Sequence, residues 1–175
     1  SDNCSNENIE KVIYPFKKKL NIKFNKNVEN LGAALNFLKA ASLATNEFIW
    51  FLGDDDLLFP NAIGDLKSLI NKNKECDFFW INSCHLDTNY LKKFNHPFDT
   101  KFLPKKMNKL SSLENDERLK FFDLIKHKIA FDYLLGVFVC VFKRDGWNKN
   151  LNIIDYKLIK DKNYWSNFEN TCFHI

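Results

Sequence analysis

The sequence predicts an α/β domain with a mostly parallel sheet, and three observations support this fold class. Segments with helical spacing alternate with short apolar segments along the 175 residues. One of them, EFIWFL at residues 47–52, is an apolar run that suits a central strand covered on both faces. The composition is that of a folded protein, because 45% of the residues are hydrophobic and 27% are charged.

Each expected element follows from its local pattern. Residues 9–16 and the segment from Asn30 carry apolar side chains at three- and four-residue intervals, which predicts amphipathic helices. Residues 59–73 predict a further helix, with Pro60 near its first turn and Ile63 facing inward. The remaining expectations are strands at 21–25, 47–52, 76–83 and 133–144, a long loop over 85–112, a helix at 115–128 and an ambiguous tail from residue 147.

Charge and cysteine content limit the classes of function. The net charge of +4 is compatible with an anionic substrate or an acidic membrane surface and demonstrates neither. No run of 18 apolar residues and no signal peptide is present, so we expect neither a membrane span nor export by that route. Five cysteines without a CxxC pair favour reduced thiols in a cytoplasmic protein.

Three adjacent carboxylates, Asp54, Asp55 and Asp56, follow the apolar run at 47–52. They repel one another, and in parallel sheets the carboxyl ends of strands are where ligands bind. Carboxylates at such an edge can bind Mg²⁺ or Mn²⁺, which prefer oxygen ligands. The alternative is an ordinary turn in which an Asp helps to begin the next helix. An EF-hand loop, a P-loop, GxGxxG, HExxH and GxSxG are all absent.

SDNCS at the start of the chain, followed by NVENLGAALNFLKAASLATNEFIWFLGDDDLLFPNAI, resembles family-two glycosyltransferases with the GT-A fold. More narrowly, it is similar to the bacterial branch related to abequosyltransferase. The resemblance is strong over residues 1–63 and loose after 77. It implies a Rossmann-like mostly parallel sheet, and relatives carry a strand and a helix upstream of SDN, so the domain looks incomplete at its N-terminus.

The resemblance also implies roles for individual residues. Asp2 and Asn3 match the segment that contacts the base or ribose of a nucleotide sugar. Asn30 and Gly32 match the family's Asn-x-Gly helix entry, so the resemblance implies that they too bind the nucleotide sugar. Asn36 matches the Asn within the family's helix. The first Asp of the family's Asp-x-Asp falls on Gly53, which moves the ligand set to 54–56. Asp54 and Asp55 are then expected to bind the nucleotide sugar, and Asp55 and Asp56 to bind Mn²⁺ or Mg²⁺. Leu35 stands where many relatives carry Arg.

The activity implied is transfer of a sugar from a nucleoside diphosphate to a hydroxyl of a surface glycan such as lipopolysaccharide, lipooligosaccharide or capsule. An inverting enzyme needs a carboxylate base, for which we favour Glu169 over Asp132, Asp145 and Asp155. His174 is a further metal candidate, although a structural or merely exposed histidine is the more common case. The alternative is a non-catalytic remnant or interaction subunit of a split glycosyltransferase.

On this interpretation residues 1–175 form a single partial domain. Residues 1–83 would be the nucleotide-sugar-binding half and residues 84–175 the acceptor-side half. The segment 92–109 mixes Lys with Phe and Pro. It would suit peripheral contact with an anionic membrane at the inner face of the cytoplasmic membrane, or it is a solvated loop, which we favour. Nucleic acid is not an expected partner.

Overall fold

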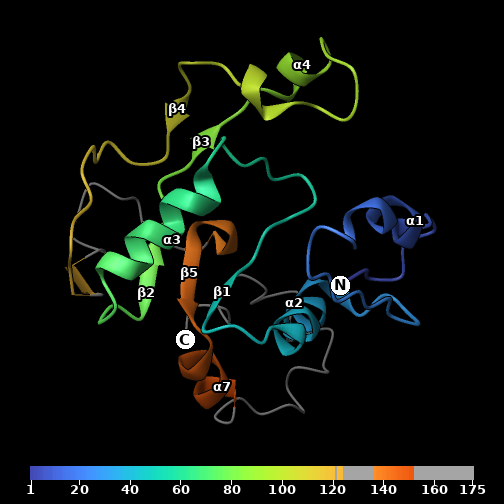
Figure 1. The fold of residues 1–175 in the computed structure, drawn as a ribbon, viewed down its shortest axis with the longest axis horizontal. Helices are drawn as coiled ribbons and strands as arrows, with labels where there is room; N and C mark the ends of the chain where they lie inside the picture. Colours follow the sequence, from blue (N-terminus) through green and yellow to red (C-terminus); the bar gives the residue numbers. More distant parts are fainter. Residues whose placement is uncertain (121, 124–135, 152–175) are drawn as a thin grey trace. The chain divides into compact units, whose positions relative to one another are not determined.

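The computed structural model describes residues 1–120, 122–123 and 136–151 (Figure 1). The chain divides into two compact units. Unit 1 consists of Ser1–Ile49 with Lys143–Ile175, and unit 2 consists of Trp50–Phe142. The boundary falls inside strand β1 (Phe48–Trp50) and at the end of strand β5 (Cys140–Lys143).

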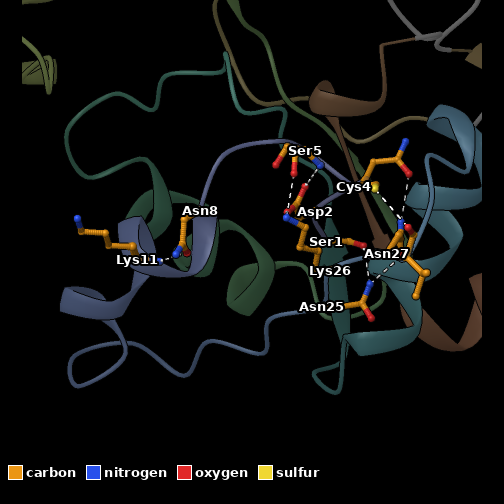
Figure 2. Close-up of polar contacts among 11 residues, drawn as sticks. Ser1, Asp2, Cys4, Ser5, Asn8, Lys11, Asn25, Lys26 and Asn27 are labelled. Atoms are coloured by element: carbon orange, nitrogen blue, oxygen red, sulfur yellow. Dashed lines mark hydrogen bonds and ion pairs between the residues drawn. The ribbon is translucent and has the colours of Figure 1, made fainter.

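Unit 1 contains mainly helices. They are α1 (Ile9–Ile13), the 3-10 helix η1 (Tyr14–Phe16), α2 (Gly32–Leu43) and α7 (Arg144–Leu151). The helices predicted over 9–16 and from Asn30 are therefore confirmed. Asn8 caps α1, since its side-chain oxygen accepts a hydrogen bond from the Lys11 N–H at 3.0 Å (Figure 2).

The strand predicted at residues 21–25 is wrong. This part of the chain makes an isolated parallel bridge between Asp2 and Lys26 instead of a strand. The alternation in NIKFN satisfied the pattern for a strand, but the segment pairs with only a few residues at the start of the chain. Backbone pairing of this length does not build a ladder.

Unit 2 contains α3 (Ala62–Lys72) and a series of short elements. These are β2 (Phe78–Trp80), β3 (Cys84–His85), α4 (Thr88–Leu91), η2 (Thr100–Phe102), β4 (Asn108–Lys109) and η3 (Val137–Val139). The region 85–112, expected to be a long loop, thus holds only single turns and two-residue strands. The strands predicted at 47–52, 76–83 and 133–144 are found as β1, β2 and β5, each shorter than expected within the described residues. Residues 133–135 of the last one lie outside the described residues.

The strands form two small sheets. In the first the order is β1-β5-β2, and β2 is antiparallel to β5 with Phe79 opposite Val141. In the second β3 is antiparallel to β4. The mixture of helices and strands confirms the α/β class. Because these two pairs are antiparallel, the mostly parallel sheet remains a prediction.

The core of unit 2 forms around β5. Val139 and Val141 are fully buried, and Phe78, Trp80 and Phe142 pack against a cluster that contains Val139. Burial raises the pKa of the Cys140 thiol to about 12, because the charged thiolate is disfavoured away from water. The four cysteines in the described ranges form no disulfide with one another.

Two expectations for helices in unit 2 need correction. Ile63 does not face inward, since 45% of its surface is exposed in the first turn of α3. Of the helix expected at 115–128, residues 115–120 are irregular, whereas Phe122 and Asp123 are helical. Residues 121 and 124–128 of that expected helix lie outside the described residues. No helix in the described ranges is long and apolar enough to cross a bilayer.

Candidate functional site

Asp2 lies in a short paired segment where the start of the chain runs beside residues 25–27. The Asp2 N–H donates to the Asn25 carbonyl, and the Asn27 N–H donates to the Asp2 carbonyl, both at 2.8 Å. The side chain is 4% exposed. Its Oδ1 accepts a hydrogen bond from the Ser5 N–H at 2.9 Å, and its Oδ2 lies 3.8 Å from the Lys26 ammonium (Figure 2).

These contacts shift the titration of Asp2. Hydrogen bonds from the Ser5 backbone and hydroxyl are the main reason why the pKa of Asp2 lies below its ordinary value, and the Lys26 charge adds to them. Burial opposes the shift and is outweighed. Asp2 is therefore ionised at neutral pH and organises the loop around Ser5. Its Oδ2 has no hydrogen-bond donor within the described residues.

Asn3 hydrogen-bonds to the other residues predicted to bind the nucleotide sugar in unit 1, apart from Asp2. Its Nδ2 donates to the Asn30 Oδ1 at 2.9 Å and to the Gly32 carbonyl at 3.3 Å, and its Oδ1 accepts from the Leu31 N–H at 2.9 Å. The structure thus places Asn3, Asn30 and Gly32 in one hydrogen-bonded cluster at the start of α2. That these three residues contact a nucleotide remains a prediction from the sequence.

Gly32 has a backbone requirement of its own. Its φ is +79°, in the left-handed region that favours glycine, while a Cβ at this position would meet nothing within 4 Å. The constraint is therefore conformational rather than steric. Gly32 lets the chain turn from the loop that Asn3 holds into α2, as the Asn-x-Gly helix entry predicts.

Asn27 is the polar residue of this region that sequence reasoning missed. It is 7% exposed. Its Nδ2 donates to the Asn3 Oδ1 at 3.1 Å and to the Asn36 Oδ1 at 3.0 Å, and its Oδ1 accepts from the Asn25 side chain at 2.8 Å. It therefore connects the start of the chain to α2. In a chain where asparagines recur throughout, no local signal separates a buried one from exposed ones.

The three aspartates lie in unit 2, in the turn after β1. Asp54 and Asp55 are exposed and Asp56 is half-buried. The Gly53 N–H donates to the Asp56 Oδ2 at 2.6 Å, and the Asp56 N–H points to the Gly53 carbonyl at 3.4 Å. The Asp56 side chain therefore closes the turn.

Gly53 explains how two of these carboxylates can lie on the same side of the turn. A Cβ built on Gly53 would be 2.6 Å from the Asp55 Oδ1 and 3.2 Å from the Asp56 Oδ2. The first distance is closer than two such atoms can approach. The space that the family's first Asp side chain would occupy is thus taken by the carboxylates of Asp55 and Asp56.

The carboxylates of Asp55 and Asp56 could supply part of the coordination shell of a hard divalent cation. Mg²⁺ and Mn²⁺ sites often take one or two protein carboxylates and complete their shell with phosphate oxygens and water. No group of three or more His, Cys, Asp or Glu side chains that could hold a metal occurs among the residues described. Metal binding by Asp55 and Asp56 stays a prediction, and so does nucleotide binding by Asp54 and Asp55.

The predicted catalytic base lies outside the described residues. This applies to Glu169, and equally to Asp132, Asp155 and His174. Asp145 is described and is exposed in the first turn of α7. Leu35, where many relatives carry Arg, is half-buried in α2. The assignment of Glu169 as base remains a prediction.

Unit 2 also contains a pocket of about 580 Å³. Aromatic side chains of β2, the end of α3 and the irregular segment 113–119 line it, with Asn82 and Asp116 among its polar groups. The indole N–H of Trp80, a lining residue, is buried and has no hydrogen-bond partner among the described residues. Such a lining offers ring faces and hydrogen-bonding groups, the features by which pockets hold small molecules.

Comparison with known proteins identifies the class. The sequence model of glycosyl transferase family 2 matches residues 1–132, which is most of the 175-residue chain and includes both groups of predicted site residues except the base. The chain therefore belongs to glycosyl transferase family 2. This membership supports the GT-A fold expected from the sequence.

Abequosyltransferase RfbV of Salmonella typhimurium is a relative, 32% identical over 97 residues. The match covers 49% of this chain and 29% of that protein, so the chain spans less than a third of the relative's length in the match. No solved structure gives a significant match.

Proposed function

We propose that the chain is the donor-binding part of a metal-dependent glycosyltransferase. It would move a sugar from a nucleoside-diphosphate sugar to a hydroxyl of a bacterial surface glycan, whether lipopolysaccharide, lipooligosaccharide or capsule. The observation that carries the proposal is the family match over residues 1–132. The similarity to an abequosyltransferase supports sugar transfer as the activity.

The chain's own residues would contribute in two ways. In unit 1, Asp2, Asn3 and Asn30 would position the nucleoside through the loop that they hold at the start of α2. In unit 2, Asp55 and Asp56 would hold Mn²⁺ or Mg²⁺ beside the diphosphate. When bound, the metal neutralises the charge of the diphosphate and makes it a better leaving group.

The reaction requires one bond to form and one to break. The acceptor oxygen bonds to the anomeric carbon, the bond from that carbon to the phosphate oxygen breaks, and the acceptor proton passes to a base. We propose Glu169 as that base, since a carboxylate within hydrogen-bond reach of the hydroxyl is needed. We also propose that the reaction takes place in the cytoplasm.

Thermal-shift titration tests the proposal. The chain is titrated with uridine, guanosine, cytidine and thymidine diphosphates in turn. One of these four nucleotides should raise the melting temperature by roughly 5–10 °C at a hundredfold excess over its Kd. The rise should require Mn²⁺ or Mg²⁺ and should be lost in Asp55→Asn and Asp56→Asn. Asp65→Asn is the matched control, because Asp65 is an exposed acid of α3 outside the turn.

A flat response to all four nucleotides, with and without metal, would contradict the proposal. It would favour the alternative of a non-catalytic remnant or interaction subunit. If the nucleotide still raises the melting temperature of both Asp variants, the result would support donor binding and refute the assignment of Asp55 and Asp56 as metal ligands.

A further inference from the structure

Residues 9–20, formed by α1, η1 and the turn after them, expose large apolar side chains. Val12, Tyr14, Phe16 and Leu20 have exposed fractions between 51% and 67%. No residue of α1 or η1 is buried. Single exposed apolar residues need no explanation, but four within nine positions mark a surface that contacts something.

The same segment is basic. It contains four lysines and one glutamate, a net charge of +3, in a chain whose total is +4. The Lys17 ammonium pairs with Glu10 at 2.9 Å. Lys11, Lys18 and Lys19 are exposed, and the Lys11 side chain points away from the other residues drawn in Figure 2.

A second segment of similar composition behaves differently. In residues 90–102, which overlap the segment 92–109 that the sequence suggests as a membrane contact, the aromatic rings pack on one another. The Phe94 ring lies 5.1 Å from those of Tyr90 and Phe98, and 5.9 Å from that of Phe102. The rings of this segment pack on one another, although Phe102 stays 57% exposed. Tyr14 and Phe16 of residues 9–20 are also exposed.

We propose that residues 9–20 bind the surface of an anionic lipid bilayer. The exposed apolar side chains would enter the boundary between headgroups and acyl chains, while the lysines contact the phosphate groups. The positive charge of the segment is complementary to an anionic surface. Charge alone would not explain why large apolar side chains are exposed beside the lysines, whereas insertion of these side chains into a bilayer would. The proposal requires neither nucleotide nor metal, so it can fail without affecting the proposed function.

Vesicle co-sedimentation of the 175-residue chain tests the proposal. The chain should sediment with vesicles of mixed phosphatidylcholine and phosphatidylglycerol, and much less with pure phosphatidylcholine. The double variant Lys18→Glu, Lys19→Glu should lower the partition coefficient by at least about 25-fold, since each lysine near such a surface contributes about fivefold. The double variant Lys105→Glu, Lys106→Glu makes the same charge change at exposed positions of the other segment and should have little effect.

The apolar contribution has its own matched pair. Val12→Ser should weaken binding severalfold, while Val28→Ser should not, although Val28 is fully exposed. Circular dichroism checks folding; if Val12→Ser does not fold, the lysine variants decide. Equal loss in both lysine pairs, equal binding to neutral vesicles, or no binding at low salt overturns the proposal. So does an oligomer that Val12→Ser dissociates, because a second copy would then cover the segment.

Discussion

The two groups of predicted donor-site residues use their acidic side chains in opposite ways. In unit 1 the Asp2 carboxylate is 4% exposed and is held by Ser5 and Lys26. In unit 2, Asp54 and Asp55 are exposed, and Asp56 contacts the backbone of Gly53. One group is tied into the fold, and the other is mostly open to solvent.

This difference separates residues that shape a site from residues available to bind a ligand. A buried carboxylate with backbone hydrogen bonds contributes to the stability of its loop. Exposed carboxylates side by side repel one another and gain nothing from the fold, so a cation is what would relieve them. Substitutions in unit 1 should therefore change the free energy of unfolding, and substitutions in the turn should change the response to metal.

The largest effect should come from Asn27→Ala. The substitution removes three side-chain hydrogen bonds and leaves the Asn3 and Asn36 oxygens short of a donor. Each lost bond at a buried site costs about 1 kcal/mol, so the free energy of unfolding should fall by about 3 kcal/mol. Urea denaturation followed by circular dichroism measures it.

Asn8→Ala is the control for this prediction. Asn8 is exposed and makes one capping bond to the Lys11 N–H at the start of α1. Its loss should cost about 1 kcal/mol. If both variants cost the same, the Asn27 network does not hold unit 1 together.

The sequence predicted the parts of this comparison that depend on local pattern. Helix α2 and strand β1 follow from apolar spacing, and Gly32 at the entry of α2 follows from the motif. Asn27 could not be predicted, because its burial depends on the start of the chain lying against residues 25–36. The short bridge at Lys26 could not be predicted for the same reason. An alternating pattern does not show how long a neighbouring segment is available for pairing.

For the acidic turn, the sequence shows which residues are present but not how their side chains are arranged. Three adjacent aspartates indicate a cation site, but not which carboxylates converge. That depends on the missing Cβ at Gly53, which allows the Asp55 and Asp56 oxygens to approach the same point.

A smaller effect on stability, with a specific effect on metal binding, is expected for Gly53→Ala. The new Cβ would lie 2.6 Å from the Asp55 Oδ1, so the carboxylate must rotate away. Because a side chain can move, the free energy of unfolding should change by less than about 1 kcal/mol. The Mn²⁺-dependent thermal shift with the best nucleotide should fall by at least half.

Gly64→Ala is the matched control. Gly64 lies inside α3 and a Cβ there would meet nothing within 4 Å. Alanine should stabilise the helix by up to about 1 kcal/mol and leave the metal-dependent shift unchanged. A full metal response in Gly53→Ala would show that the convergence of the two carboxylates is not required.

The smallest effect concerns the pH dependence of Asp2→Asn. The folded-state pKa of Asp2 lies below 3.8, its ordinary value, so its ionised form stabilises the fold above pH 3.8 and this contribution is lost as the pH falls further. Wild type should melt at a higher temperature than Asp2→Asn at pH 6, and the difference should shrink below pH 3.8. Ser5→Ala removes the hydroxyl bond that helps to lower this pKa and should give an intermediate pH dependence. A difference between wild type and Asp2→Asn that stays constant from pH 6 to pH 3 would mean that the carboxylate acts through its shape in the loop, and not through its charge.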